Sequence, residues 1–300
     1  MLGFLFAGQG SQAIGMGSDL YQQEEIFRNI FDTYPEIRDL IFKGDKKELD
    51  QTKNCQKAIL LTSYAIAKVL EKNNIKPDYV AGLSLGEYSA LAFSNTWSLD
   101  ASLEIVTKRG LIMQNALNDG KSGMRAVIGT DEETIKKALA KVSKGICTIA
   151  NYNCPGQIVI TGENEALDEA QKLLNEIKPT RLIPLNVTGA FHSALLNDAS
   201  NELFEVLKKY EKNKPTYKVL YNYTGDESTE DINVILKEQI SHSVYFESII
   251  RNMILKGVDT FIEIGPGKAL SSFVRKTNSD VKVFTVNNSK DLELVIGGLK

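Results

Sequence analysis

The stretch best suited to chemistry is Gly82-Leu83-Ser84-Leu85-Gly86, in which a serine stands two residues from a glycine on each side. The apolar run at 77–81 predicts a buried strand, and the helix formers at 87–93 predict a helix. Between a strand and a helix, this pattern is typical of a nucleophile elbow, whose glycines permit a tight turn that projects the serine hydroxyl. Free backbone N–H groups at the helix N-terminus can hold a developing oxyanion. The pattern also arises by chance, so its context is what makes Ser84 the candidate nucleophile.

A serine nucleophile needs a base, and the chain has only two histidines, His192 and His242. His192 stands among small residues just before a predicted helix, which suits a base, although a lone histidine there could equally be a surface or capping residue. Ser84 and His192 are 108 residues apart, so only the fold can bring them together. In serine esterases an acidic residue between the serine and the histidine normally orients the histidine. Here the acidic residues that most closely precede His192 lie in the segment 124–184, which is predicted below to be a separate subdomain, so the ordinary esterase interpretation is weakened. A backbone or amide carbonyl could orient the imidazole instead.

Two further segments carry polar residues in an apolar setting. Gly8-Gln9-Gly10-Ser11-Gln12 follows a predicted first strand, at the sheet edge where open α/β folds bind ligands, and it lacks the Gly-Lys-Ser/Thr ending of a phosphate loop. Lys108-Arg109-Gly110 lies in a mainly apolar helix predicted over 99–118. A buried Arg109 would need an anionic partner, whereas an exposed one would mean nothing, and periodicity alone leaves both interpretations open.

The rhythm of the chain changes after residue 123. Up to there, and again from residue 185, strands alternate with amphipathic helices, which is typical of a mostly parallel sheet. Between these parts the order is strand, helix, strand, strand, helix, strand, the ferredoxin-like βαββαβ unit. We therefore predict an α/β protein with a hydrolase-like main domain, residues 1–123 and 185–300, and an inserted ferredoxin-like subdomain, residues 124–184.

Three local predictions complete this outline. Tyr152-Asn153-Cys154-Pro155-Gly156, between strands predicted at 147–150 and 157–161, is interpreted as a hairpin-like loop that could reach over the cleft. A helix is predicted over 202–212 after His192. The last predicted element is a strand at 282–286.

Composition limits the possible partners. A net charge of −3 over 300 residues gives no reason to expect nucleic acid or an anionic membrane surface. The apolar N-terminal run is too short for a signal sequence or a membrane span. Three cysteines without metal-ligand spacing favour a reduced, cytoplasmic protein. A monomer is the default expectation.

Five motifs in this order resemble the malonyl-CoA:acyl carrier protein transacylases of bacterial fatty acid synthesis and the acyltransferase domains of polyketide synthases. Each motif alone is weak, but five in register across the whole chain are highly specific. The motifs are Gly8-Gln9-Gly10-Ser11-Gln12, Gly82-x-Ser84-Leu85-Gly86-Glu87-Tyr88, Lys108-Arg109-Gly110, Gly189-Ala190-Phe191-His192-Ser193 and Glu263-Ile264-Gly265-Pro266-Gly267.

The resemblance implies a reaction and the residues that perform it. Ser84, deprotonated by His192, would attack the malonyl thioester, and the backbone N–H groups of Gln9 and Leu85 would form the oxyanion hole. A carbonyl at Gln239 would orient the histidine. The malonyl-serine would then pass its acyl group to the phosphopantetheine thiol of a holo acyl carrier protein, a ping-pong sequence that needs no metal or redox cofactor.

The resemblance also assigns the substrate pocket to Arg109, Met113 and Phe191. Arg109 would hold the malonyl carboxylate in a bidentate pair and discriminate against acetyl groups. Phe191 resembles the malonyl-selective form of its motif. The chain departs from the family at Leu83, where histidine is usual, and at Ser241-His242-Ser243-Val244, where Asn-Pro-Val is common. His242 is interpreted as structural.

Three alternatives remain open at this stage. A trans-acting acyltransferase for a polyketide assembly line would share all these residues. A serine thioesterase would give the acyl group to water. A non-catalytic module that binds carrier protein would not require Ser84, His192 and Arg109 together.

Overall fold

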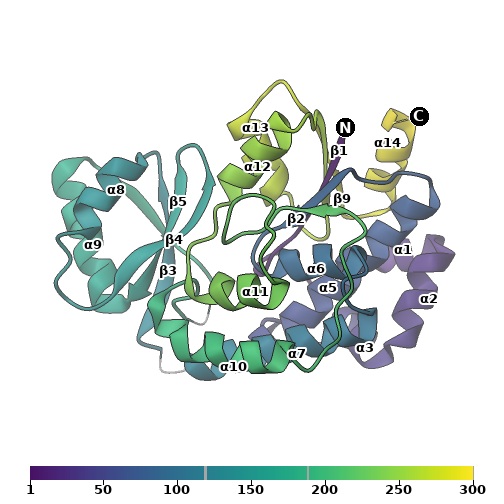
Figure 1. Ribbon diagram of the computed structural model, residues 1–300, viewed down its shortest axis with the longest axis horizontal. Coiled ribbons are helices and arrows are strands. Elements are labelled where there is room, and N and C mark those ends of the chain that lie inside the picture. Colours follow the sequence, from purple (N-terminus) through teal and green to yellow (C-terminus); the bar gives the residue numbers. More distant parts are fainter. Residues whose placement is uncertain (118–119, 188, 300) are drawn as a thin grey trace.

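The computed structural model describes residues 1–117, 120–187 and 189–299 (Figure 1). Its larger sheet has the strand order β7-β2-β1-β8-β9, and every neighbouring pair is parallel. Parallel strands need crossover connections, which the helices supply. The strands are β1 (Leu2–Phe6), β2 (Tyr79–Gly82), β7 (Lys218–Val219), β8 (Thr260–Ile264) and β9 (Lys282–Val286).

Helices cover both faces of this sheet. Because side chains alternate along a strand, β1 turns Phe4 and Phe6 to one face, where both rings lie 5.9 Å from the ring of Phe93. Leu5 turns to the other face, into a cluster with Phe246 and Phe273. Figure 1 shows the two helix layers on opposite sides of the strands. The layer on the side of Phe4 and Phe6 consists of α5 (Thr52–Lys72), α6 (Leu85–Phe93) and α7 (Leu99–Ala116). The layer on the side of Leu5 consists of α12 (Phe246–Leu255) and α13 (Ala269–Thr277).

The second sheet is antiparallel and has the order β4-β5-β3-β6. This order, with its helices packed on one face, is the ferredoxin-like arrangement, so the predicted fold class is confirmed. On this arrangement we propose that residues 124–184 form the small subdomain and that 1–123 with 185–300 form the main domain. The elements of the smaller unit are β3 (Ser122–Ile128), α8 (Glu132–Leu139), β4 (Cys147–Cys154), β5 (Gln157–Glu163), α9 (Asn164–Ile177) and β6 (Arg181–Pro184).

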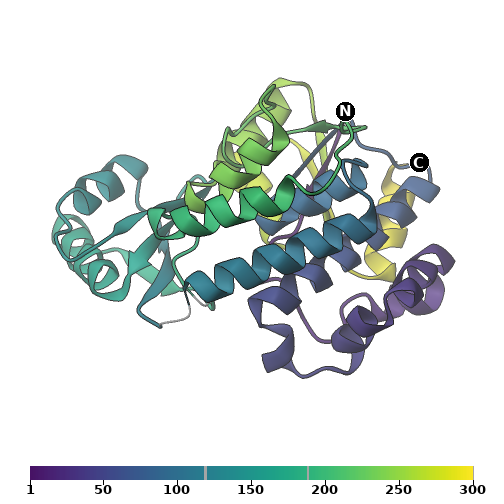
Figure 2. The same cartoon turned by 60° about the horizontal axis from the view of Figure 1, so that its bottom comes forward.

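The remaining helices surround the main sheet. Helix α10 packs against both α7 and α11, and Figure 2 shows these long helices side by side. No helix within the described ranges is both long and apolar enough to cross a membrane. The helices that remain after α5–α9, α12 and α13 are α1 (Ser18–Gln23), α2 (Glu25–Thr33), α3 (Pro35–Lys43), α4 (Lys46–Leu49), α10 (Asn197–Leu207), α11 (Ile232–Ser241) and α14 (Ser289–Leu299).

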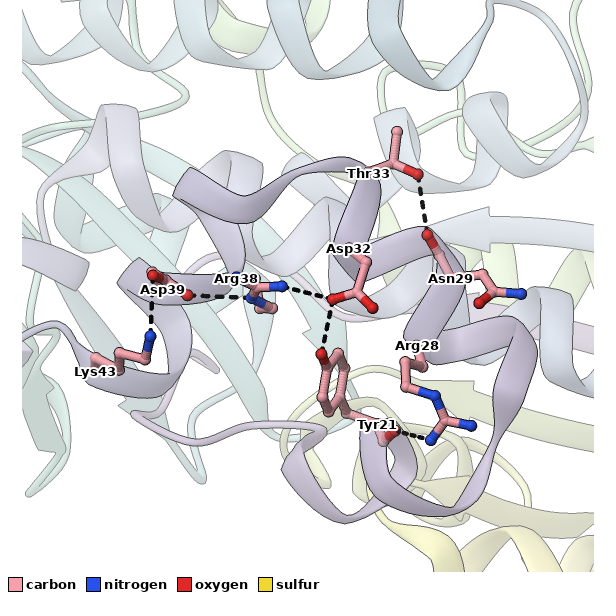
Figure 3. A network of polar contacts seen from close by, with 8 residues as sticks. All are labelled: Tyr21, Arg28, Asn29, Asp32, Thr33, Arg38, Asp39 and Lys43. Atoms are coloured by element: carbon pink, nitrogen blue, oxygen red, sulfur yellow. Dashed lines mark hydrogen bonds and ion pairs between the residues drawn. The ribbon is translucent and has the colours of Figure 1, made fainter.

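A polar network ties α1, α2 and α3 together at the surface (Figure 3). The Tyr21 hydroxyl donates to the Asp32 carboxylate at 2.7 Å, and Arg38 pairs with Asp32 at 2.5 Å and with Asp39 at 3.1 Å. Hydrogen bonds from Tyr21 and Arg38 hold the pKa of Asp32 below its usual value. Exposed pairs of this kind contribute little stability each, so the network connects the surface helices but adds little to the free energy of unfolding.

Three local predictions were wrong. Strand β4 continues to Cys154, so the hairpin turn consists only of Pro155 and Gly156 rather than of five residues. The helix after His192 starts and ends earlier than predicted, as α10, behind a 3-10 turn at Ala194–Leu196. A final helix, α14, follows the last predicted strand. Helix α7 ends at Ala116 among the described residues, and Asn118, the predicted end, lies outside them.

The tight elbow generates a stability prediction. A Cβ on Gly86 would lie 2.1 Å from the Phe6 carbonyl oxygen, which belongs to the central strand and cannot move away. Gly86→Ala should lower the free energy of unfolding by about 2–3 kcal/mol or more, measured by urea titration. Gly297→Ala is the control, since a Cβ there meets no atom of the described residues within 4 Å and alanine favours a helix. A Gly86→Ala protein as stable as the control would contradict the close approach.

Candidate active site

Ser84 lies at the turn between β2 and α6, in an unusual backbone conformation with φ 52° and ψ −102°. A non-glycine residue pays about 1–3 kcal/mol for such a conformation, and strain of this size is common at active sites. The turn places the serine at the N-terminus of α6, where backbone N–H groups point outward. The structure therefore has the geometry expected of a nucleophile elbow.

The fold brings His192 to this serine. Ser84 Oγ lies 2.8 Å from His192 Nε2, and His192 Nδ1 lies 2.8 Å from the backbone carbonyl oxygen of Gln239. A carbonyl can only accept, so Nδ1 carries the ring proton and Nε2 accepts the serine hydroxyl. The neutral tautomer that can act as a base is thus fixed without a carboxylate.

The surroundings keep this histidine neutral. His192 is buried, and burial together with the positive charge of Arg109 lowers the pKa of its imidazole to about 4. At neutral pH the ring is therefore free to accept a proton.

Arg109 is buried, which settles the question that its helix pattern left open. Only 1% of it is exposed, and its Nη2 donates to Ser84 Oγ and to Gln239 Oε1, each at 3.2 Å. Its guanidinium stacks over the ring of Tyr88 at 5.0 Å. No carboxylate among the described residues forms an ion pair with it, and Nε has no hydrogen-bond partner there. Burial lowers the pKa of Arg109, yet a guanidinium stays charged in proteins, so this cation is ready for an anion.

Two backbone N–H groups near the nucleophile belong to Leu85, the next residue in the chain, and to Gln9, which lines the same cavity as Ser84. The loops that follow β1 and β2 are in close contact, since a Cβ on Gly8 would lie 2.5 Å from the Leu83 carbonyl oxygen. The amides of Gln9 and Leu85 donate to no acceptor among the described residues. They remain available for an oxyanion beside Ser84.

A cavity of about 110 Å³ lies over the nucleophile. It adjoins a second cavity of about 420 Å³ that shares Leu83 and Asn153 in its lining. The sequence-predicted residues that line the inner cavity are Gln9, Ser84, Met113, Phe191 and His192. With Arg109 and Gln239 bonded to Ser84 and Leu85 next to it, the predicted site residues are all brought together. His242 is half exposed and lies beside Glu238, so it is not part of this group.

Comparison with known proteins identifies the family. The acyl transferase domain family matches residues 3–296. The chain is 42% identical to a malonyl CoA-acyl carrier protein transacylase of Bacillus subtilis (strain 168), over 100% of this chain and 97% of that protein. A transacylase structure from Clostridium perfringens superposes with a TM-score of 0.96 and 40% identity, covering 99% of this chain and 96% of that one. A malonyl-transacylase solved with a type II polyketide synthase acyl-carrier protein gives 0.95 and 31% identity, with 99% of each chain covered.

The chain belongs to the malonyl CoA-acyl carrier protein transacylase family. It is an acyltransferase, as its sequence motifs predicted.

Sequence reasoning missed several polar residues of this family member's site. Gln56, fully buried on α5, donates through Nε2 to Gln9 Oε1 at 3.2 Å and so holds the Gln9 side chain in the loop after β1. Asn151 and Asn153 line the cavity from β4. The glutamine on the apolar face of a helix was an available signal, because polar side chains seldom occupy such positions without a role. The asparagines gave no such signal, because the strand was predicted to end at residue 150 and Asn153 was assigned to a loop that could reach over the cleft. No group of three or more His, Cys, Asp or Glu residues in the described part of the chain could hold a metal ion.

The lowered pKa of His192 generates a pH prediction. A histidine with a depressed pKa is in its basic form above that pKa and loses it only as the pH falls through about 4. The rate of Ser84 labelling by an uncharged fluorophosphonate should therefore stay high down to pH 5 and be halved near pH 4. Fluorescence of the buried Trp97 checks that the protein remains folded. A midpoint near the ordinary histidine value of about 6.5 would show that the imidazole is well solvated.

Proposed function

We propose that this protein transfers a malonyl group from malonyl-CoA to the phosphopantetheine thiol of a holo acyl carrier protein, and so supplies fatty acid synthesis. The observation that carries the proposal is the buried Arg109 cation, whose Nη2 lies 3.2 Å from Ser84 Oγ and which forms no ion pair with a carboxylate in the described part of the chain. A serine hydrolase for neutral acyl groups has no use for such a cation, whereas a dicarboxylic thioester supplies its partner.

In the first half-reaction, Ser84 becomes acylated. His192 takes the hydroxyl proton at Nε2 while Oγ attacks the thioester carbonyl of malonyl-CoA. The N–H groups of Gln9 and Leu85 stabilise the resulting oxyanion. When the tetrahedral intermediate collapses, the carbon–sulfur bond breaks, and the departing CoA thiolate receives the proton from His192. A malonyl-serine remains.

The second half-reaction runs the same steps with another thiol. His192 takes the proton of the phosphopantetheine thiol, and the thiolate attacks the malonyl-serine carbonyl. Collapse of the second intermediate returns the proton to Ser84 Oγ and leaves malonyl on the carrier protein. The residues present complete both steps without a metal or redox cofactor.

Arg109 selects the substrate in this scheme. A malonyl carboxylate can pair with the guanidinium in a bidentate arrangement, whereas an acetyl group would leave the buried charge without a partner. Met113 and Phe191 bound the small inner cavity, which suits a short acyl group.

A polyketide pathway is the second candidate. It is favoured by the similarity to the transacylase solved with a polyketide synthase carrier protein. The chemistry at Ser84 is the same in the fatty acid and polyketide pathways, so the carrier protein that the enzyme prefers distinguishes the two candidates. For either pathway we propose a cytoplasmic monomer whose partners are malonyl-CoA and the carrier protein, without nucleic acid or membrane.

The nucleophile can be tested by intact mass spectrometry. After mixing with malonyl-CoA and an acid quench, the protein should gain one malonyl adduct on Ser84, which should move to holo carrier protein when that is added. Ser84→Ala should form no adduct and lower the transfer rate by at least about a thousandfold. Ser200→Ala is the control, since that hydroxyl donates to the backbone carbonyl of Asn197 in its own helix, α10.

The fate of the adduct decides between the alternatives. An adduct released mainly as free malonate would make the protein a thioesterase. An adduct on Ser84→Ala would show that another residue is the nucleophile.

The role of Arg109 can be tested by selectivity. Arg109→Ala should reduce the preference for malonyl-CoA over acetyl-CoA about a hundredfold, because an ion pair worth roughly 2–3 kcal/mol is lost. Lys108→Ala is the matched control, since Lys108 is the neighbouring cation on α7 but contacts Tyr210 and Glu104 at the surface. An unchanged ratio of kcat/KM values in Arg109→Ala would exclude a carboxylate contact.

A further inference from the structure

One buried side chain, Asn222, holds both ends of the nucleophile turn. Its Oδ1 accepts the backbone N–H of Ser84 at 2.6 Å, and its Nδ2 donates to the carbonyl oxygen of Gly82 at 2.6 Å. Asn222 follows β7, 138 residues after the serine, and is fully buried. A single amide thus connects the end of β2 to the strained residue that follows it.

Asn222 is in turn held by the elbow helix. Its own backbone N–H donates to Glu87 Oε2 at 2.6 Å, and Glu87 is a fully buried residue in the first turn of α6. The carbonyl oxygen of Asn222 accepts the backbone N–H of Tyr245 at 2.9 Å. The turn, the helix after it and the segment after β7 therefore form a closed ring of hydrogen bonds.

The ring explains how the strained conformation persists. Ser84 has a positive φ that an L-residue rarely adopts, so the free turn would relax. Relaxation would rotate the Ser84 N–H away from Asn222 and would also move Oγ away from Nε2 of His192, now 2.8 Å distant. Both asparagine contacts are compatible only with the conformation that aligns the nucleophile and its base.

We propose that Asn222 is a positioning residue for the acylation of Ser84, and that Glu87 keeps Asn222 in place as a hydrogen-bond acceptor. The inference rests on the proposed function only in taking Ser84 as the nucleophile. Asn222 does not line the cavity over Ser84, and its side chain bonds only to the backbone of the elbow among the described residues, so it acts through the position of Ser84.

Glu87 acts in this ring without its charge. No cation among the described residues forms an ion pair with it, and burial raises the pKa of its carboxyl to about 8. At neutral pH the carboxyl is largely protonated, and it can still accept the Asn222 N–H. An amide of the same shape can do the same.

The test compares Asn222→Ala with Asn252→Ala. Asn252, on α12, donates through its side-chain amide to the carbonyl oxygen of Gly225, which lies in the same segment after β7 as Asn222. It forms no hydrogen bond with the elbow among the described residues, so it is a matched control. Asn222→Ala should slow fluorophosphonate labelling of Ser84 and lower kcat for malonyl transfer by about 10- to 100-fold, the scale expected for a small misplacement of a reacting group. KM for malonyl-CoA and the malonyl-to-acetyl ratio should change less than about twofold, because Arg109 is untouched. Asn252→Ala should match the wild type.

A second pair of variants covers a failure of Asn222→Ala to fold. Glu87→Ala removes the support of Asn222 and should reproduce its slow labelling, whereas Glu87→Gln keeps an acceptor and should remain within about threefold of the wild type. Thermal melting reports the folded fraction of each protein. Folded Asn222→Ala that labels at the wild-type rate, or equal rates for folded Glu87→Ala and Glu87→Gln, would overturn the proposal.

The two readouts separate this inference from the proposed function. Labelling by the fluorophosphonate does not involve malonyl-CoA. A wild-type protein that is not malonylated, but whose labelling depends on Asn222, would refute the function and keep the inference. If the wild type is malonylated but Asn222→Ala is labelled at the wild-type rate, the proposed function stands and the inference about Asn222 is refuted.

Discussion

The close approach of β1, β2 and α6 is the constraint on which the rest of the site depends. Gly86 packs against the Phe6 carbonyl oxygen, and Gly8 packs against the Leu83 carbonyl oxygen, with no room for a side chain at either position. This approach sets the nucleophile beside the loop that carries Gln9, which lines the same cavity as Ser84. The two amides that we propose for the oxyanion hole therefore come from the turns after β1 and β2. The close approach also forces Ser84 into its positive φ, which requires support from outside the turn.

The second organising interaction is the burial of a cation. The Tyr88 ring and the Gln239 amide offset part of the desolvation cost of the Arg109 charge, but no carboxylate among the described residues pairs with it. The same charge that suits an anionic substrate also lowers the pKa of His192. Arg109 therefore adds to the effect of burial in keeping His192 neutral, and we propose that the same residue selects the substrate.

The second sheet is hydrogen-bonded to the segment that follows the Gln239 carbonyl. Gln239, whose carbonyl orients His192, lies near the end of α11, and the residues that follow bond to β4. Val244 donates its N–H to Ala150 at 2.8 Å and accepts from Tyr152 at 2.9 Å, and the Ser243 hydroxyl donates to Ile149 at 2.6 Å. This segment lacks the proline common in the family, and backbone pairing with β4 anchors it. The strand that lines the cavity and the carbonyl that orients His192 are therefore held by the same backbone pairing.

Local patterns were sufficient to predict the elbow and both sheets, because glycine spacing and hydrophobic periodicity are written in neighbouring residues. The residues that support the site were harder to predict. A backbone carbonyl such as that of Gln239 carries no residue-type signal, and only the family resemblance indicated it. Asn222 stands in Tyr221-Asn222-Tyr223, a sequence equally typical of an ordinary loop. Its importance arises from a partner 138 residues away, and a contact at that distance is a property of the fold rather than of any segment. The pattern that predicts Ser84 lies in neighbouring residues, whereas the side chain of Asn222 that holds this serine in its strained conformation comes from a distant segment.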